Sequence, residues 1–411
     1  GFSGGRARRG LVLRDGRVRP SRRALMTETA SDTTPVREQH VFDEAALCGY
    51  LERSGKLPNF QAPLKVTQFG HGQSNPTFLL TCANGQQFVL RKQPPGSLIS
   101  KTAHRVDREF LVMRALQSTP VPVPEMYLLC GDTAEDPSPV GKPFYVMEFM
   151  KGRLFKNVGL PEVAVADRRE YWLALVEALA ALHSVDFRGV GLGDYGKDSG
   201  YFERQTGSLS AVSRAQEAVS EAVPRIPGFD DLARALREHQ PPDAAAICHG
   251  DFKMDNVIFH PTEPRVIAVL DWEMSTIGHY GADLGNCLSP LYPPEGDDEV
   301  ARSAQAGAQF LFPLEPGKAK ESGLPTREEL VERYCKVRKD LNLSDELRRA
   351  WYYVSFYQWK TSVILQGIAA RAARGQASSP QARSVGELAG AMGQAGTVSM
   401  RRYQKMGQAR L

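Results

Sequence analysis

The eight residues HGDFKMDN, at positions 249–256, constrain this chain more than any other stretch. They hold two acids, Asp251 and Asp255, and end in Asn256. Fifteen residues further on, Asp271 interrupts the apolar run VIAVLDWE. Burying a carboxylate at the end of an apolar strand is costly unless it gains a partner such as a metal ion. These residues therefore form either a polar turn between two strands or a site that holds a metal and a phosphate.

The spacing of the motif suits phosphoryl transfer. It matches the pattern H-R-D-L-x-x-x-N, with the interval between acid and amide preserved. An acid at Asp251 would accept the proton of an attacking hydroxyl, and Asn256 would reach a metal that bridges the phosphates. Lys253 would neutralise charge on the transferred group, and Asp271 stands where protein kinases carry a second metal ligand. The spacing therefore favours the metal-and-phosphate interpretation over the turn.

A glycine-containing loop, FGHGQSNPTFLL, lies upstream. Gly70 and Gly72 precede a strand rather than a helix, which argues against a dinucleotide-binding turn. Glycines between antiparallel strands let the backbone close over phosphates. Ser74 and Asn75 could replace glycine backbone contacts with side-chain hydrogen bonds. Taken alone, the loop could also be a plain hairpin turn.

The next strand ends in FVLRK, and a cation at this point holds the α and β phosphates in kinases. Alternation along a strand turns only one of Arg91 and Lys92 inward. Glu109, on the following helix, is expected at the border of the buried face, where it could pair with that cation. A solvated basic pair and a surface acid remain the alternatives.

The stretch FYVMEFMKG predicts a strand that leads into a short crossover. Exposed backbone groups near Glu148 and Met150 could read the edge of an adenine. The alternative is a simple connecting strand.

Hydrophobic periodicity divides the chain into two parts. Residues 60–150 predict strand, glycine loop, strand, helix, strand and strand, with Asn84-Gly85 as a hairpin turn. After Gly152 the pattern is mostly helical. Helices are expected at 41–55, 102–118, 167–184, 208–239 with a break near Pro227, 326–341 and 345–374. We therefore expect an α+β, two-lobed fold, with a small mixed lobe over 36–151 and a helical lobe over 152–400.

The charge distribution argues against nucleic acid as a partner. The net charge is +4, but residues 1–25 carry eight Arg and one Asp, so the rest of the chain is slightly acidic. A nucleic-acid-binding surface would need clustered positive charge. No run of about eighteen apolar residues exists, so no membrane span is expected. The six cysteines lack metal-site spacing, which indicates isolated reduced thiols.

The two ends of the sequence lead to expectations about processing and location. Residues 1–35 are Arg-rich or small and polar, so we expect disorder there, in a targeting peptide or in sequence upstream of a start at Met26. The chain ends in Ala409, Arg410 and Leu411, a relaxed form of a peroxisomal signal. A soluble intracellular protein of the peroxisome or cytosol is expected, with the mitochondrion less favoured.

Taken together, the motifs resemble one family. HGD in place of HRD, Trp272 after the second acid, and GADLGN at 281–286 are typical of the aminoglycoside-phosphotransferase-like branch of the protein-kinase fold. GHGQSNPTFLL, VLRKQPPG, VDREFLVMRAL, LDWEMSTIGH and WYYVSFYQWKTSVILQGIAARA look most similar to the kinase-like N-terminal domain of acyl-CoA dehydrogenase family members 10 and 11. The similarity runs from about residue 40 to residue 375.

The resemblance implies roles for the site residues. Asp251 would be the catalytic base, and Asn256 and Asp271 would hold Mg²⁺, with ATP as co-substrate. Arg91 or Lys92 would position the phosphates together with Glu109.

The resemblance also implies residues that support the loop. Asp283 would be the acid that props up the catalytic loop, and His249 is expected to brace it. Asp255 is expected only as a solvent-facing neighbour of Asn256.

The acceptor is the least constrained part of the prediction. Family members phosphorylate hydroxyls of small molecules, and those linked to acyl-CoA dehydrogenases are associated with 4-hydroxy fatty acids or their CoA thioesters. A 4-hydroxyacyl-CoA or hydroxy acid is thus implied, with a separate acyl-CoA dehydrogenase acting downstream. Two alternatives stay open, an aminoglycoside or amino-sugar kinase and a nucleotide-binding pseudokinase scaffold. The intact Asp251, Asn256 and Asp271 argue against the scaffold.

The aromatic content of residues 345–374 bears on the acceptor. The residues concerned are Trp351, Tyr352, Tyr353, Phe356, Tyr357 and Trp359. Some could line an apolar acceptor pocket that suits an acyl chain, and the alternative is that they bury the helix. An aminoglycoside pocket would want clustered acids. The only dense acidic run, Glu295–Glu299, is typical of a solvated loop.

Overall fold

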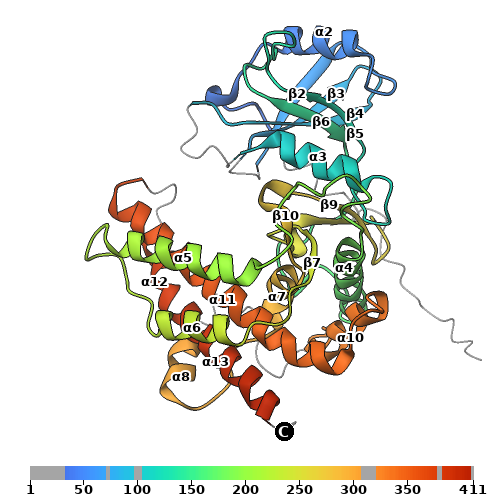
Figure 1. The fold of residues 1–411 in the computed structure, drawn as a ribbon. Helices are drawn as coiled ribbons and strands as arrows, with labels where there is room; N and C mark the ends of the chain where they lie inside the picture. The colour runs from blue at the N-terminus through green and yellow to red at the C-terminus, as the bar shows by residue number, and fades with distance from the viewer. Residues whose placement is uncertain (1–32, 71–74, 97–103, 307–320, 377–381, 409–411) are drawn as a thin grey trace, which may run out of the picture.

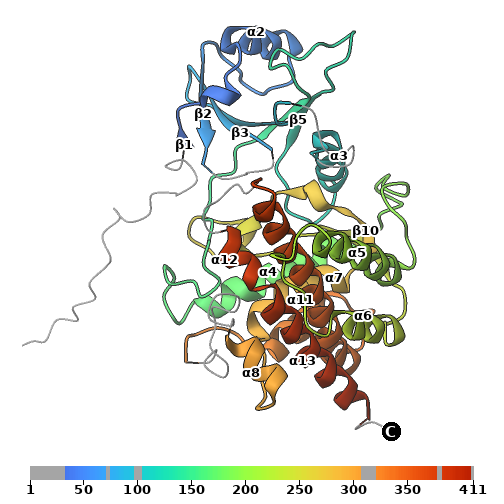
Figure 2. The ribbon, with the colours of Figure 1, turned by 90° about the vertical axis from the view of Figure 1, so that its left-hand side faces the viewer.

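The computed structural model describes residues 33–70, 75–96, 104–306, 321–376 and 382–408. They form a small lobe built on a sheet and a larger, mainly helical lobe (Figure 1), which stay separate in the perpendicular view (Figure 2). The expected α+β, two-lobed fold is confirmed. Gly72, Ser74, most of the segment 1–35 and the terminal Ala409-Arg410-Leu411 lie outside the described residues.

The small lobe is built on one antiparallel six-stranded sheet in the order β1-β2-β3-β4-β6-β5. Its strands are β1 (Thr33–Thr34), β2 (Leu64–Phe69), β3 (Thr77–Cys82), β4 (Gln87–Lys92), β5 (Met126–Cys130) and β6 (Phe144–Glu148). The turn that joins β3 and β4 contains Gly85 at a φ of 83°, as the Asn-Gly signal predicts.

Two helices cover this sheet, α2 (Glu44–Ser54) and α3 (Val106–Leu116). Helix α2 is set by its caps, because the Asp43 side chain accepts the N–H of Ala46 and Gly55 takes a left-handed conformation. In Figure 1, α2 lies above the sheet and α3 lies below it, toward the large lobe. Both helices lie within the ranges that periodicity predicted.

The pleat of β4 separates two chemical environments. Phe88, Leu90 and Lys92 face the small lobe's own core, together with residues of α2. Val89 and Arg91 face the opposite side, where α3 and the large lobe lie. Since side chains alternate along a strand, this register decides which of the two cations reaches the space between the lobes.

The large lobe is built around one long helix, α11 (Leu343–Ala373). The other helices are α4 (Arg168–His183), α5 (Tyr201–Glu217), α6 (Phe229–Glu238), α7 (Gly281–Leu288), α8 (Glu299–Ala306), α10 (Arg327–Val337), α12 (Ala382–Glu387) and α13 (Ala389–Gln408). The predicted helix at 208–239 is divided into α5 and α6, because residues 218–228 turn between them.

Two short strand pairs carry the motif loops. Strand β7 (Ala245–Cys248) pairs with β10 (Thr276–His279), and β8 (Val257–Phe259) pairs with β9 (Val266–Val269). The sequence predicts only two short strands over residues 244–272, where β7, β8 and β9 lie, because strands of three or four residues show too little alternation. The HGD motif follows β7, and Asp271 follows β9, so both loops leave the same part of the lobe.

Helix α13 was not predicted from the sequence. It contains Gly390, Gly393 and Gly396, and glycine lowers intrinsic helix propensity. A Cβ on Gly396 would lie 2.9 Å from Leu232 and 3.2 Å from the carbonyl oxygen of Ser355 on α11. Close packing along α11 therefore stabilises a helix that its own composition does not favour.

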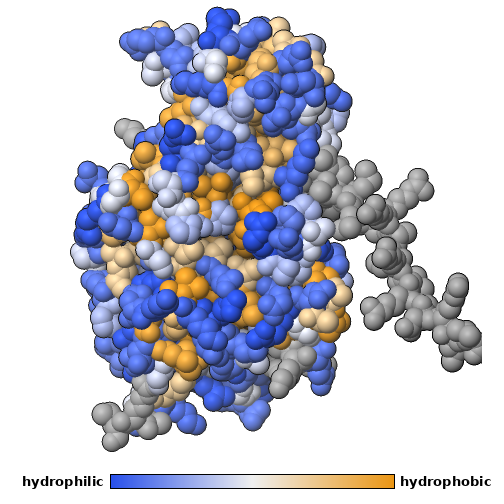
Figure 3. Space-filling view, turned by 90° about the vertical axis from the view of Figure 1, so that its right-hand side faces the viewer, coloured by the Kyte–Doolittle hydropathy of each residue, from blue (hydrophilic) through white to orange (hydrophobic). Residues whose placement is uncertain are grey.

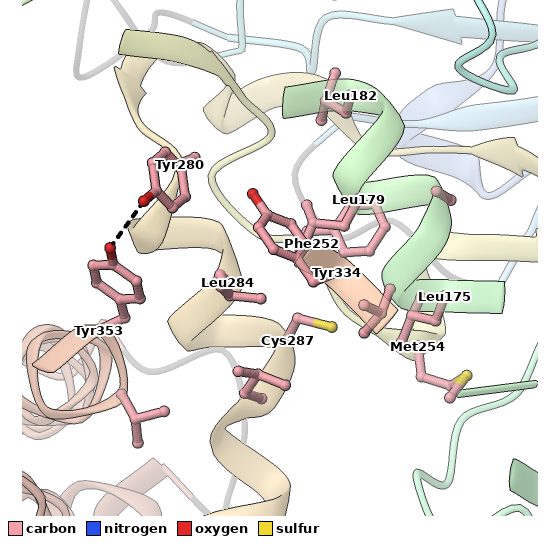
Figure 4. Close-up of a cluster of buried hydrophobic side chains, with 14 of the residues drawn as sticks. Leu175, Leu179, Leu182, Phe252, Met254, Tyr280, Leu284, Cys287, Tyr334 and Tyr353 are labelled. Carbon is pink, nitrogen blue, oxygen red and sulfur yellow. Dashed lines mark hydrogen bonds between the residues drawn. The ribbon is translucent and has the colours of Figure 1, made fainter. Parts of the chain in front are cut away.

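The aromatic residues of α11 mostly form core. The buried ones are Trp351, Tyr352, Tyr353, Phe356 and Trp359. Tyr353 donates a hydrogen bond of 3.2 Å to Tyr280, the residue directly before α7, at the edge of the cluster drawn in Figure 4. An acceptor pocket lined by these five residues is therefore excluded, because neighbouring helices surround α11. Tyr357 alone of the six predicted aromatics stays partly accessible.

The helices and the cysteines bear on two expectations from the sequence, that no segment spans a membrane and that the thiols are isolated. None of the helices in the described ranges is long and apolar enough to cross a bilayer. All six cysteines are free thiols, as their spacing predicted.

The contact between α7 and α11 gives a stability prediction. A Cβ on Gly285 would lie 2.2 Å from the carbonyl oxygen of Tyr353. Gly285→Ala should therefore lower the free energy of unfolding by about 1–3 kcal/mol, because the two helices would have to separate. Gly207 lies on the exposed side of α5, where a Cβ would meet nothing within 4 Å. Gly207→Ala should therefore raise the free energy of unfolding, by at most about 1 kcal/mol. Urea denaturation measures both, and equal losses would contradict the packing explanation.

Candidate active site

The loop at residues 249–256, called the catalytic loop after its predicted role, alternates between core and cleft. Phe252 and Met254 are buried among α4, α7 and α10 (Figure 4), while Asp251, Lys253 and Asp255 remain accessible. Phe252 and Met254 therefore anchor the loop in the core of the large lobe, and the residues that alternate with them point away from that core. The loop then ends in a short 3-10 turn at Met254–Asn256 before β8.

Gly250 is required by the backbone of this loop. It has a φ of 87°, which side chains rarely tolerate, and a Cβ there would lie 2.4 Å from the carbonyl oxygen of Met274. The catalytic loop thus passes directly against the segment that follows Asp271. This contact brings the two motif loops together.

Asp283 holds the start of the loop. Its carboxylate accepts the N–H of His249 at 2.5 Å and the N–H of Gly250 at 2.8 Å. The residue is 1% exposed, and burial would raise the pKa of its carboxyl, but His183 and the backbone donors outweigh burial and lower it. The ionised carboxylate is therefore a fixed acceptor on α7 for the backbone of the loop.

His249 joins the two motif loops. Its Nε2 lies 2.8 Å from the carbonyl oxygen of Leu270, and its Nδ1 accepts the N–H of Asp251 at 3.2 Å. The ring also packs against Trp272, with the centroids 4.7 Å apart. The imidazole therefore ties the backbone before Asp271 to the backbone of Asp251.

The Asp251 carboxylate is held by three neighbours. Asn256 Nδ2 lies 3.1 Å from its Oδ2, and Asn286 Nδ2 lies 3.3 Å from its Oδ1. Lys253 Nζ lies 3.2 Å from Oδ2 and 3.5 Å from Asp255. The side chain of Asp251 is still 39% exposed, so a ligand in the cleft can reach it. Asn286 was not predicted, although it ends the GADLGN motif.

Arg91 reaches across the cleft from the small lobe to Asp271. The guanidinium lies 2.5 Å from Asp271, 3.1 Å from Glu109 and 3.8 Å from Glu273. Burial lowers the pKa of Arg91, but these carboxylates outweigh burial and raise it. Asp271 itself adopts a left-handed backbone with a φ of 65° at the start of a 3-10 turn. The four side chains form one charged cluster between the lobes.

Lys92 lies on the other side of the sheet and not at this cluster. Its Nζ is 3.4 Å from the carbonyl oxygen of Val140 and 5.1 Å from the ring centroid of Phe42. The prediction left Arg91 and Lys92 as alternatives, and the strand register turns only Arg91 toward the cleft. The inclusion of Lys92 among the nucleotide contacts is therefore corrected.

Glu109 is buried and fully engaged. Its carboxylate accepts from Asn75 Nδ2 at 2.7 Å and from the Tyr145 hydroxyl at 3.1 Å, besides its pairing with Arg91. Burial raises the pKa of Glu109 to about 7, although Arg91 opposes the shift. The Asn75 Oδ1 lies 3.1 Å from His104 Nδ1, so its amide is used within the protein. Asn75 is buried and its side chain is directed toward α3, so its contact with phosphate stays a prediction that these hydrogen bonds do not favour.

A cavity of about 200 Å³ lies next to this charged cluster, between the lobes. Apolar side chains from both lobes line most of it: Phe69, Val89, Met113, Met147, Phe149, Ile258 and Leu270. Arg91, Asp255, Asn256 and Asp271 line its polar end. Figure 3 shows hydrophobic surface gathered at this level, where the lobes meet. The arrangement suits a flat apolar group that carries an anionic tail.

The predicted strand-to-crossover segment borders the same cavity. Glu148 and Met150 both line it, while Gly70 lies at an exposed position just after Phe69. The Glu148 carboxylate accepts the N–H of Glu125 at 3.2 Å, which turns this side chain onto β5. Asp255 is exposed, as expected, and it also lines the cavity.

Comparison with solved structures defines the class of protein. A Ralstonia eutropha protein assigned as an aminoglycoside phosphotransferase is similar, with a TM-score of 0.72 and 34% identity, over 89% of this chain and 99% of that chain. Choline kinase from Cryptosporidium parvum is similar in fold alone, with a TM-score of 0.51 and 12% identity, over 89% and 96%. The fold is therefore that of two-lobed, kinase-like phosphotransferases.

Sequence comparison gives the family. The model of the phosphotransferase enzyme family matches residues 65–321, and this chain belongs to that family. Acyl-CoA dehydrogenase family member 11 of Gallus gallus is 41% identical over 362 residues, which are 87% of this chain and 43% of that protein. Family member 10 of Mus musculus is 36% identical, over 88% and 31%. The chain thus spans less than half the length of these curated relatives.

A buried histidine next to α7 gives a pH prediction. His279 Nδ1 accepts the N–H of Gly281, and its Nε2 lies 3.1 Å from the carbonyl oxygen of Pro242, so only the neutral ring fits. Burial lowers the pKa of His279 to about 4. The neutral His279 ring should make its full contribution to the free energy of unfolding above about pH 6.5. This contribution, up to about 3 kcal/mol, should be lost as the pH falls toward 4, because the unfolded state then binds the proton more readily.

His279→Gln should show a smaller fall in the free energy of unfolding over this range than the wild-type chain. Urea denaturation at pH 7, 6 and 5 measures the two slopes. Equal slopes would contradict the assignment to His279.

Proposed function

We propose that this chain transfers the γ-phosphoryl group of ATP to a hydroxyl of a small molecule, a 4-hydroxyacyl-CoA or hydroxy acid, with Mg²⁺ as cofactor. The observation that carries the proposal is the convergence of Arg91, Asn256 and Asp271 at the polar end of the interlobe cavity, with the Asp251 carboxylate hydrogen-bonded to Asn256 beside it. Membership of the phosphotransferase enzyme family supports the reaction class.

The geometry of Asp251 suits the role of general base. Its carboxylate is accessible and is fixed by two amide donors, Asn256 and Asn286. The acceptor hydroxyl would give its proton to Asp251 while its oxygen forms a bond to the γ-phosphorus and the bond to ADP breaks. Lys253, beside the same oxygen, would balance charge on the transferred group.

Asn256 and Asp271 fit a magnesium site. The Asn256 amide nitrogen is used by Asp251, so its amide oxygen is the atom left for a ligand, and the Asp271 carboxylate lines the same cavity. No three His, Cys, Asp or Glu side chains of the described residues cluster tightly enough to hold a metal alone. Magnesium commonly binds through one or two protein oxygens plus phosphates and water. When bound, the ion would neutralise charge on the β and γ phosphates.

Arg91 is suited to orient the phosphates. Its guanidinium is planar and can bind two phosphate oxygens at once, unlike a lysine. Glu109 and Glu273 would keep it in the cleft when Asp271 turns to the metal. The apolar part of the cavity would take the adenine ring, beside the backbone of Glu148 and Met150.

The acceptor proposal rests on the relatives. The curated relatives named above are acyl-CoA dehydrogenase family members, so we propose that an acyl-CoA dehydrogenase acts after the phosphorylation. The amino-sugar alternative lacks support near the site. The acids of the run Glu295–Glu299 pair elsewhere, with Glu295 on Arg327 and Asp298 on Arg401.

The base assignment predicts a loss of turnover. Asp251→Asn should lower kcat for phosphorylation of 4-hydroxydecanoyl-CoA by about 10²–10⁴-fold, because the proton acceptor is removed. A coupled ADP-release assay measures the rate, with Asp231→Asn on α6 as the control that keeps wild-type turnover. Turnover on kanamycin-type sugars alone would favour the second enzyme class, and nucleotide binding without turnover on any hydroxyl would favour a scaffold.

The pleat of β4 predicts opposite effects for adjacent cations. Arg91→Met should weaken binding of Mg-ATP by about tenfold or more, because a charged contact to phosphate is lost. Lys92→Met should leave the affinity within about twofold, since Lys92 lies on the other face. Calorimetric titration with Mg-ATP measures both, and similar losses in the two variants would contradict the assignment.

A further inference from the structure

The accessible side chains of α11 form a single stripe. Between Trp351 and Ala370, the residues that are not fully buried are Tyr357, Lys360, Thr361, Ile364 and Ile368. Their separations of three and four residues place them on one face of the helix. Every other side chain in this span packs into the large lobe, so this face is the part of the central helix that a ligand can meet. We call these five residues the α11 stripe.

The α11 stripe faces the catalytic loop. Lys360 Nζ lies 3.4 Å from the carbonyl oxygen of Gly250, the residue directly before Asp251. Burial raises the pKa of the Tyr357 hydroxyl, and the charge of Asp251 raises it further, so Tyr357 also lies within electrostatic reach of the loop. The start of the stripe therefore lies beside the loop, next to the residue that carries the Asp251 carboxylate.

The chemistry of the α11 stripe is cationic and apolar. An ammonium group has three donors, and Gly250 takes one from Lys360, which leaves the others for a ligand. Ile364, one turn further along, is a large hydrophobic residue that is 49% exposed. The sequence contains no acid between Glu346 and Glu387, so the stripe offers no carboxylate to a cation.

An apolar side chain also borders the loop from the other direction. Met274, which follows Asp271 by three residues, is 55% exposed. Its backbone is in close contact with Gly250, the same residue that Lys360 contacts. Met274 and the α11 stripe thus approach the catalytic loop at one point of its backbone, next to Asp251.

We propose that the α11 stripe is the acceptor-binding surface, where Lys360 takes an anionic group of the acceptor and Ile364 and Met274 contact its hydrocarbon chain. The inference rests on the proposed function, because the acceptor hydroxyl must lie at Asp251. The acceptor that fits is an amphipathic hydroxy compound with a negative charge, either the carboxylate of a hydroxy acid or a phosphate of a CoA thioester. A polycationic sugar would meet the like charge of Lys360.

Three acceptors with one chain length test the charge contact. They are 4-hydroxydecanoate, its neutral methyl ester and 4-hydroxydecanoyl-CoA, each assayed with Mg-ATP and the full chain. Lys360→Met should lower kcat/KM for at least one anionic acceptor by about tenfold to a hundredfold, mainly through KM, and change the ester by less than about threefold. Loss on the free acid assigns the contact to the carboxylate, and loss on the thioester alone assigns it to CoA phosphates.

Two further variants separate binding from folding. Lys360→Arg keeps the charge and should retain most of the activity on the anionic acceptor. Lys336→Met, an exposed lysine of α10, should match the wild-type chain on all three acceptors. An equal loss on the ester and the anions in Lys360→Met would show that Lys360 only supports the loop, and would overturn the proposal. No loss on either anion would overturn it as well.

A binding measurement distinguishes failure of this inference from failure of the proposed function. Calorimetry with the Mg-ADP-loaded chain should give a Kd for the anionic acceptors that Lys360→Met raises at least tenfold. Such binding without phosphate transfer in the wild-type chain would overturn the proposed function and keep the acceptor surface. If the wild-type chain binds neither anion, the acceptor surface is overturned.

The apolar part of the stripe has its own test. Lengthening the acceptor from six to ten carbons should raise kcat/KM in the wild-type chain, and Ile364→Ser should reduce this gain by about threefold or more. Val337→Ser, at an exposed apolar position on α10, is the matched control and should keep the full gain. If Ile364→Ser leaves the gain in kcat/KM unchanged, the acceptor's hydrocarbon chain does not contact Ile364, and this part of the proposal is overturned.

Discussion

The site depends on one buried carboxylate. Asp283 accepts two consecutive backbone N–H groups, from His249 and Gly250, and it has no solvent to compete for them. A charge-assisted bond to backbone fixes peptide orientation rather than a side-chain rotamer, so the direction of Asp251 follows from the position of α7. His249 then transmits this position to the backbone before Asp271. The two motif loops are therefore oriented from a single point inside the large lobe.

The small lobe meets this framework through charge as well as through apolar packing. Arg91 is surrounded by carboxylates from both lobes, Glu109 on one side and Asp271 and Glu273 on the other. Such a cluster has more negative than positive charge, so it favours a ligand that brings cations with its phosphates. Apolar surfaces of both lobes complete the cavity. The cleft thus lies between the motif loops of the large lobe, which hydrogen bonds hold in place, and a small-lobe surface that contacts them through the Arg91 cluster.

The sequence predicts which residue types gather at the site better than it predicts which way each side chain points. Spacing alone predicted Asp251, Asn256 and Asp271 as site residues, because each stands in a short segment of distinctive composition. The fold places Asn256 and Asp271 on one cavity and Asp251 in contact with Asn256. Spacing could not decide whether Arg91 or Lys92 faces the cleft. A strand that is buried on both faces shows no polar-apolar alternation, so the sequence does not tell which side chains point to which face. Nor could it find α13, which exists because α11 supplies the surface that packs against its glycines.

The glycines of α7 have a mechanical consequence. With no side chain at Gly281 or Gly285, α7 rests against the ring and backbone of Tyr353, so the helix that carries Asp283 and the helix that carries Lys360 form one rigid unit. Under the proposed function, the Asp251 carboxylate and the α11 stripe would then keep a fixed separation. Evolution of such a chain toward a different acceptor would have to change side chains along the stripe, because widening the separation would also displace the base.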